Sequence, residues 1–203
     1  HFAGDNNGAF TLNSFDAGLR DNMVPESATA IFTADSTLAE LQEKLTAYTT
    51  AENLTAELTQ EGDAFRLTVV GKSAHGSTPE LGINGATYLA KFLNQFAFEG
   101  AAKAYLETAA NVLHGDFAGE NLGVAYTDEK MGALSMNAGV FKFDRNSDDN
   151  TITLNFRYPQ GTDAQTIKAE LEKLNGVTKV TLSDHEHTPC LLYTSDAADD
   201  LLC

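Results

Sequence analysis

The sequence has few cysteines, few positive charges and no long hydrophobic run. Its two cysteines, Cys190 and Cys203, both lie near the C-terminal end of the 203 residues. The body of the chain therefore has no disulfide framework, which is typical of a cytoplasmic protein. No stretch approaches the roughly 18 consecutive apolar residues that cross a bilayer, and no basic-then-apolar leader is visible.

The shortage of lysine and arginine gives the chain a strongly negative charge. There are 13 Lys and Arg against 29 Asp and Glu, so the formal net charge is −16 at pH 7. Such a surface repels nucleic-acid phosphates and anionic membranes, and we expect neither as a partner. The composition, 42% hydrophobic and 21% charged, is sufficient for one globular domain with a core.

Hydrophobic periodicity predicts a mixture of strands and helices. Strands are expected at 9–17, 28–34, 54–59, 64–70, 131–143, 151–157 and 177–182, and helices at 37–50, 82–96, 101–113 and 165–174. Ser36 is the expected N-cap of the first helix, and Asn175-Gly176 the expected C-cap of the last. This order predicts an α+β domain of antiparallel sheets with helices packed on one face, and it suggests two related halves.

The stretch Gly71–Pro79 is the most informative part of the chain. It places His75 on a loop between an expected strand and an expected helix, among small residues that allow a ligand to approach the imidazole. A surface histidine in a turn is the plainer interpretation of the same residues. A phosphate-binding P-loop is excluded, because Arg66 stands where that motif needs glycine. A Gly-x-Ser-x-Gly nucleophile elbow is also excluded, because His75 stands at its last position.

Two further polar residues are candidates for substrate binding. Arg157 ends an alternating apolar strand, and a guanidinium can hold a carboxylate through two parallel hydrogen bonds. An ordinary salt bridge is the alternative in so acidic a chain. Asn22 offers an amide in a turn, where ordinary turn chemistry is the alternative.

Two histidine patterns resemble metal sites only superficially. His114-Gly115-Asp116 has a His-x-Asp spacing, but a histidine at a helix C-terminus is the favoured interpretation. His185-Glu186-His187 offers two imidazoles without a third ligand, and a solvated loop is favoured there. We therefore expect no metal ligand in this chain.

Three segments, in order, resemble the lid domain of co-catalytic zinc dipeptidases of the PepV and carnosinase type, in the aminoacylase/carboxypeptidase clan. They are Gly18–Pro25, Gly71–Pro79 and Thr153–Pro159, and the resemblance extends from about residue 1 to residue 188. It implies a lid of ferredoxin-like halves in a hydrolase that cleaves dipeptides. It also implies that His75 is catalytic, donating to the oxyanion, and that Arg157 and Asn22 hold the terminal carboxylate of the substrate.

The resemblance has consequences for domain organisation. It implies two zinc ions in a catalytic domain of the same protein, whose ligands fall outside this chain, so we expect a fragment that is inactive alone. Residues 1–188 are the expected lid, and residues 189–203 an expected non-native tail that matches nothing in the family. The alternative is a stand-alone, non-catalytic α+β binding or dimerisation module.

Overall fold

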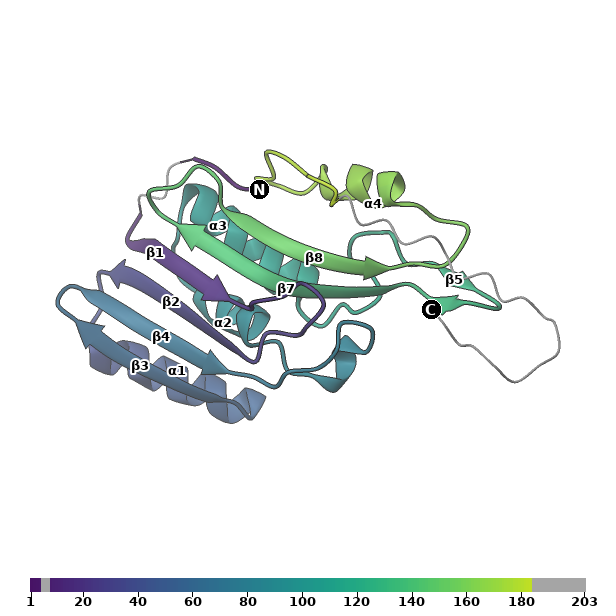
Figure 1. Cartoon of the computed structure of the whole chain (residues 1–203). Helices are drawn as coiled ribbons and strands as arrows, with labels where there is room; N and C mark the ends of the chain where they lie inside the picture. Colours follow the sequence, from purple (N-terminus) through teal and green to yellow (C-terminus); the bar gives the residue numbers. More distant parts are fainter. Residues whose placement is uncertain (5–7, 184–203) are drawn as a thin grey trace.

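A computed structural model describes residues 1–4 and 8–183. Over these residues the chain forms one six-stranded antiparallel sheet in the order β3-β4-β2-β1-β7-β8, together with a small two-stranded hairpin, β5-β6 (Figure 1). The predicted α+β fold is confirmed. His185-Glu186-His187 and the expected tail from residue 189 lie outside the described residues.

The elements alternate along the chain much as the periodicity predicts. Their bounds are β1 Phe10–Ala17, β2 Ser27–Ala34, α1 Leu38–Glu52, β3 Thr55–Glu61, β4 Ala64–Val70, the short 3-10 turn η1 Pro79–Leu81, α2 Gly85–Leu93, α3 Gly100–Glu107, the π-helical turn η2 Thr108–Leu113, β5 Thr127–Asp128, β6 Gly132–Ala133, β7 Ser135–Asp144, β8 Thr151–Arg157 and α4 Ala164–Leu171. Among these described helices, none is long and apolar enough to cross a membrane.

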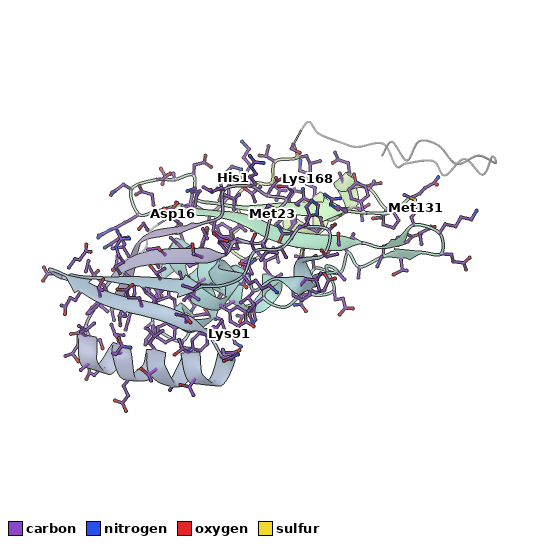
Figure 2. The ribbon with its side chains drawn as sticks, turned by 60° about the horizontal axis from the view of Figure 1, so that its bottom comes forward. His1, Asp16, Met23, Lys91, Met131 and Lys168 are labelled. Atoms are coloured by element: carbon purple, nitrogen blue, oxygen red, sulfur yellow. The ribbon has the colours of Figure 1, made fainter. Side chains whose placement is uncertain are left out.

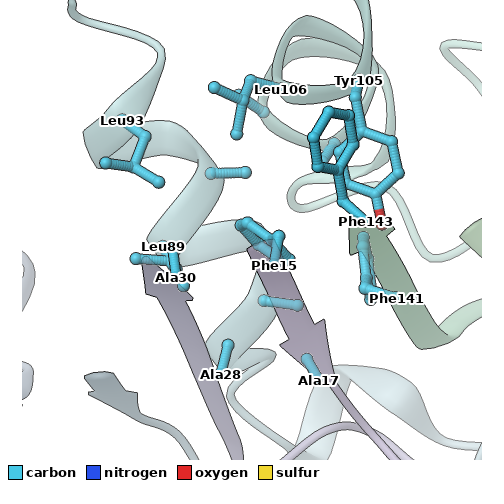
Figure 3. Packing of buried hydrophobic residues seen from close by; sticks show 14 of the residues in the cluster. Phe15, Ala17, Ala28, Ala30, Leu89, Leu93, Tyr105, Leu106, Phe141 and Phe143 are labelled. Carbon is cyan, nitrogen blue, oxygen red and sulfur yellow. The ribbon is translucent and has the colours of Figure 1, made fainter. Parts of the chain in front are cut away.

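One face of the sheet carries the hydrophobic core. Alternate residues of each strand point to the same face. In Figure 3 the apolar residues of β1, β2 and β7 pack against those of α2 and α3. Tyr105 of α3 is fully buried there, with ring centroids 5.8 Å from Phe15 and 5.2 Å from Phe143. Its hydroxyl donates to the carbonyl of Thr151 at 2.9 Å, which satisfies the one polar atom of this ring.

The opposite face of the sheet is polar. The hydroxyls of Thr29 and Thr68 lie 2.9 Å apart across β2 and β4. Asp16 and Lys142 stand directly opposite each other on β1 and β7 and form an ion pair. Since this face lacks the apolar half of the strands, its surface is available for polar chemistry.

Helix α1 packs beside α2 on the core side of the sheet. The hydroxyl of Tyr48 donates to the carbonyl of Tyr88 at 2.8 Å, and Lys91 pairs with Glu52 at 2.6 Å, next to α1 in Figure 2. In contrast, α4 lies along the β8 edge of the sheet (Figure 1).

The expected N-cap of α1 is wrong by one residue. The Thr37 hydroxyl accepts from the Glu40 N–H at 3.2 Å, and the Glu40 carboxylate accepts from the Thr37 N–H at 2.9 Å. This reciprocal pair is a capping box, which satisfies two backbone donors that a helix N-terminus otherwise leaves free. Ser36 donates instead to the Glu40 side chain at 3.0 Å.

Two expectations at the C-terminal end are also wrong. Helix α4 ends at Leu171, and Gly176, at φ +77°, belongs to the turn that follows it. The expected strand 177–182 is not formed, because its neighbour is the short segment at His1 and Phe2. Val177 makes a single bridge to Phe2, and the Thr178 N–H donates to the His1 carbonyl at 3.0 Å, which is too little pairing for a strand.

Candidate functional site

Two of the three segments that resemble the dipeptidase lid lie side by side. Met23 and His75 form an antiparallel bridge. The Val24 N–H donates to the Ala74 carbonyl at 2.8 Å, and the Gly76 N–H donates to the Asn22 carbonyl at 2.7 Å. The loop that carries His75 is therefore tied by its backbone to the turn that carries Asn22.

Glycine is required where these two segments meet. A Cβ on Gly76 would lie 2.9 Å from the Asn22 carbonyl oxygen, closer than real Cβ atoms come to a neighbour. The small residues around His75 thus admit another stretch of backbone, whereas the sequence interpretation was that they admit a ligand.

The same loop is closed at its other end. The Lys72 N–H donates to the Ile83 carbonyl at 2.8 Å, and the Ile83 N–H donates back at 2.9 Å. The chain is extended there, so helix α2 begins at Gly85, three residues later than expected. Asn84 is its N-cap and accepts from the Ala86 and Thr87 N–H groups.

The His75 imidazole is exposed, and its tautomer follows from its neighbours. Nδ1 lies 2.7 Å from the Ser77 hydroxyl oxygen and 3.2 Å from the Ser77 backbone nitrogen. A backbone N–H can only donate, so Nδ1 accepts, and the proton of the neutral ring is on Nε2. His75 therefore presents an N–H donor, the polarity that a developing oxyanion requires.

Arg157 ends β8 on the polar face of the sheet, opposite Ser135 of β7. It shares a strand face with Asn155, about 7 Å away along the strand. The Asn155 amide donates to the Asp21 carboxylate at 3.3 Å, so this face looks toward the turn that holds Asn22. Among residues 1–4 and 8–183, none of the ion pairs within 4.0 Å includes the Arg157 guanidinium. The salt-bridge alternative therefore finds no support among those residues.

Sequence reasoning missed the residues that bring these segments together. Gly139 forms a β-bulge in β7, where the pairing with β8 shifts between Ala138 and Val140. A Cβ on Gly139 would lie 2.3 Å from the Asp21 carbonyl oxygen, so the β1–β2 connection passes directly against this strand (Figure 1). A glycine inside an apolar strand was the available signal, since it marks a bulge or a close backbone approach.

The His114-x-Asp116 pattern is structural. His114 follows the last π-helical turn, contacts the Thr87 hydroxyl through Nδ1 at 3.1 Å and packs edge-on against Tyr88. Asp116 is buried and accepts from four backbone N–H groups, those of residues 118–121. In the part of the chain that the structure describes, no three His, Cys, Asp or Glu side chains group as metal ligands.

His114 is expected to make stability depend on pH. Burial lowers the pKa of its imidazole, with the nearby Lys91 charge as a second cause. The unfolded chain then binds a proton before the folded chain does, so stability is full above about pH 6.5 and falls as the pH drops through the lowered pKa. One proton changes the free energy of unfolding by at most about 1.4 kcal/mol per pH unit. Because the His114 ring is only half-buried, we expect a slope well below this limit.

The measurement is urea unfolding between pH 7.5 and pH 5. A His114→Gln variant is expected to lose less stability over this interval than the unmodified chain. His75→Gln serves as the matched control, since His75 is exposed. An equal loss in the unmodified chain and His114→Gln would contradict the prediction.

Comparisons with known proteins identify the family of this chain. The family model described as "Peptidase dimerisation domain" matches residues 63–179. The chain is 33% identical over 183 residues to the "Beta-Ala-Xaa dipeptidase" of Lactobacillus delbrueckii subsp. lactis, which covers 90% of this chain and 38% of that protein. It is 29% identical over 151 residues to a "Putative dipeptidase" of Staphylococcus haemolyticus, covering 74% of this chain and 32% of that protein.

The chain thus spans less than two-fifths of the length of these relatives, 38% and 32%. The matched range 63–179 contains two of the three candidate residues, His75 and Arg157, and more than half of the chain. The chain belongs to the peptidase dimerisation domain family.

Proposed function

We propose that this chain is the lid of a dipeptidase and contributes three side chains to the substrate site. His75 donates its Nε2 proton to the oxygen that becomes negative as the peptide carbonyl is attacked. Asn22 and Arg157 hold the terminal carboxylate of the substrate. The observation that carries the proposal is the bridge between Met23 and His75, which brings two segments far apart in the sequence side by side.

The roles assigned to the lid residues depend on two negative charges, that of the developing oxyanion and that of the substrate carboxylate. Negative charge grows on the carbonyl oxygen during attack, so a fixed N–H donor stabilises the transition state more than the substrate. An arginine that grips the terminal carboxylate limits the substrate to short peptides, because a longer chain has no free carboxylate at that distance. Closure of the lid would exclude water and bring His75 to the scissile bond.

The zinc ions implied by the resemblance do not fit the residues described. No set of three suitable side chains groups together within them. We therefore assign the metal chemistry to a separate catalytic domain, as the resemblance implies. A cytoplasmic location and the lack of nucleic-acid or membrane partners remain expectations from composition.

The chain alone is expected to hydrolyse no dipeptide, with or without added zinc. The three lid residues can hold a substrate and its oxyanion, but no described group of side chains can hold the ions that activate water. Purified chain would be incubated with zinc and a panel of dipeptides. Turnover that follows the protein through every purification step would contradict the assignment of catalysis to another domain.

The direct test of the lid is a chimera. Residues 1–183 would replace the matching segment of the Lactobacillus relative, which shares 33% identity over 183 residues. We expect the chimera to cleave a β-alanyl dipeptide, the substrate class in that relative's name. A folded, metal-loaded chimera without activity would argue against the lid function.

In the chimera, Arg157→Lys is expected to raise KM about tenfold while kcat stays within about threefold. Lysine keeps the charge but loses the two-pronged geometry, and one charge-assisted hydrogen bond is worth about 1.5 kcal/mol or more. Steady-state kinetics on one dipeptide gives both constants. The matched control is Arg66→Lys on β4, whose guanidinium lies 3.8 Å from Glu61. An unchanged KM would remove Arg157 from the carboxylate site.

A second candidate function is a non-catalytic binding or dimerisation module. It is favoured by the family's description and by the sheet, in which β3 is an edge strand that, unlike β8, has no helix along its edge among the described elements (Figure 1). An edge strand presents backbone groups that a second copy can pair with. Analytical ultracentrifugation of the chain tests self-association, and an inactive chimera together with a stable dimer would favour this function over the lid.

A further inference from the structure

Asn137 is a buried polar residue in an apolar part of β7. Only 2% of it is exposed, and its neighbours Met136 and Ala138 belong to the core. It stands opposite Asn155 of β8 in the strand ladder. A buried amide destabilises the fold unless it is hydrogen-bonded, so its partners indicate its purpose.

The partners of Asn137 are the two carbonyl groups on either side of Asn22. Its Nδ2 donates to the Asp21 carbonyl at 2.7 Å and to the Met23 carbonyl at 3.0 Å. Backbone carbonyls can only accept, so the orientation of the amide is determined by chemistry. One side chain therefore fixes the backbone before and after Asn22.

The Asn137 hydrogen bonds also affect the position of His75, because one of them holds Met23. Met23 is the bridge partner of His75, and the hydrogen bonds on either side of that bridge come from Val24 and Gly76. Loss of the Asn137 bonds would free the strip of backbone to which the His75 loop is tied.

Arg157 is connected to this arrangement from the other side. Asn155, the ladder partner of Asn137, donates to the Asp21 side chain at 3.3 Å and lies two residues before Arg157. Asp21 is thus held at two groups: Asn137 binds its backbone carbonyl and Asn155 binds its carboxylate. Asn22 thus lies between the two residues whose carbonyls Asn137 binds, Arg157 follows Asn155 by two residues, and His75 joins this arrangement through its bridge to Met23.

We propose that Asn137 is a positioning residue, which sets Asn22 and, through the Met23 bridge, His75 in the geometry that the site requires. The proposal rests on the function proposed above for Asn22 and His75. Asn137 itself does not contact the substrate; it acts through Asn22 and His75.

The first test uses the chain itself and does not need activity. In Asn137→Asp the shape is kept, but both donors are replaced by an oxygen that faces two carbonyl oxygens. We expect amide hydrogen exchange at Val24 and Gly76 to rise at least about tenfold, because a lost hydrogen bond lowers the local opening free energy. Amides at the centre of β2 and β4 should change less than about threefold.

Asn150→Ala is the matched control. Asn150 is also a buried asparagine, at the closed end of the same β7–β8 hairpin, where its amide donates to the Ser147 carbonyl at 3.0 Å. Asn150→Ala should lower the melting temperature without a selective rise in amide hydrogen exchange at Val24 and Gly76. If Asn137→Asp does not fold, Asn137→Ser, whose hydroxyl is too short to reach both carbonyls, is measured in its place.

Three results would overturn the proposal: unchanged exchange at Val24 and Gly76, an equal rise over the whole sheet, or the same selective rise in Asn150→Ala. In an active chimera, Asn137→Asp should also raise KM and lower kcat by at least about threefold each, while Asn150→Ala changes neither. An inactive chimera would count against the lid function alone, since the exchange experiment decides the positioning role without it.

Discussion

His75→Ala in the chimera is expected to lower kcat by a factor on the order of 10² to 10³, with a small change in KM. The imidazole is proposed to meet an oxygen whose negative charge grows toward the transition state, and loss of one such donor typically costs about 3–4 kcal/mol. Folding should be unaffected, since His75 is exposed and its ring contacts Ser77 within its own loop. Steady-state kinetics and a melting curve from the same preparation provide the measurement.

His75→Gln is the matched variant for this experiment. Glutamine offers an amide N–H at a similar reach to Nε2, so it should recover part of the lost kcat, whereas alanine cannot. If instead kcat of a folded, metal-loaded His75→Ala enzyme stayed within threefold of the unmodified chimera, His75 would be a surface histidine in a turn and nothing more.

Gly139→Ala is expected to destabilise the chain by about 2–3 kcal/mol and to lower its melting temperature by roughly 5–10 °C. The added Cβ would lie 2.3 Å from the Asp21 carbonyl oxygen and 2.5 Å from its Cα, and both are backbone atoms that cannot rotate away. The β1–β2 connection must therefore move off β7, and the Asn137 bonds to it are strained or lost. Differential scanning calorimetry of the purified chain measures the effect.

The control is Gly123→Ala, where a Cβ would meet no atom within 4 Å. That glycine has φ +72°, so alanine there carries only the cost of a left-handed backbone, about 1 kcal/mol. A Gly139→Ala loss no larger than the Gly123→Ala loss would show that the connection adapts easily to the added methyl group.

Much of the local structure could be predicted from the sequence. Strands β4 and β8 have the predicted bounds, 64–70 and 151–157. A strand that is buried on one face alternates apolar and polar residues, so its sequence pattern indicates its position directly. The turn at Gly62, which has φ +62°, joins β3 and β4, as glycine between two alternating strands indicates. Local signals failed where two adjacent residues could play the same part, as Ser36 and Thr37 could at the N-cap of α1.

The identity of the candidate residues also came from the sequence. His75, Asn22 and Arg157 lie in three short segments that resemble a known lid, and the family is confirmed by the match over residues 63–179. Their roles as a hydrogen-bond donor and carboxylate ligands remain proposals that the kinetic experiments above test.

Only the tertiary structure decided which segments meet. Hydrophobic periodicity indicates which residues of an element are buried, but not which other segment buries them. No local pattern could therefore pair Met23 with His75 or place Asp21 against Gly139. The same limit explains the missing last strand, since a strand exists only where a neighbour of sufficient length pairs with it. The sequence by itself determined the elements and the chemical groups of this protein. Backbone pairing between distant segments determined which of the candidate residues lie close together, because hydrogen bonds and close packing depend on proximity in space.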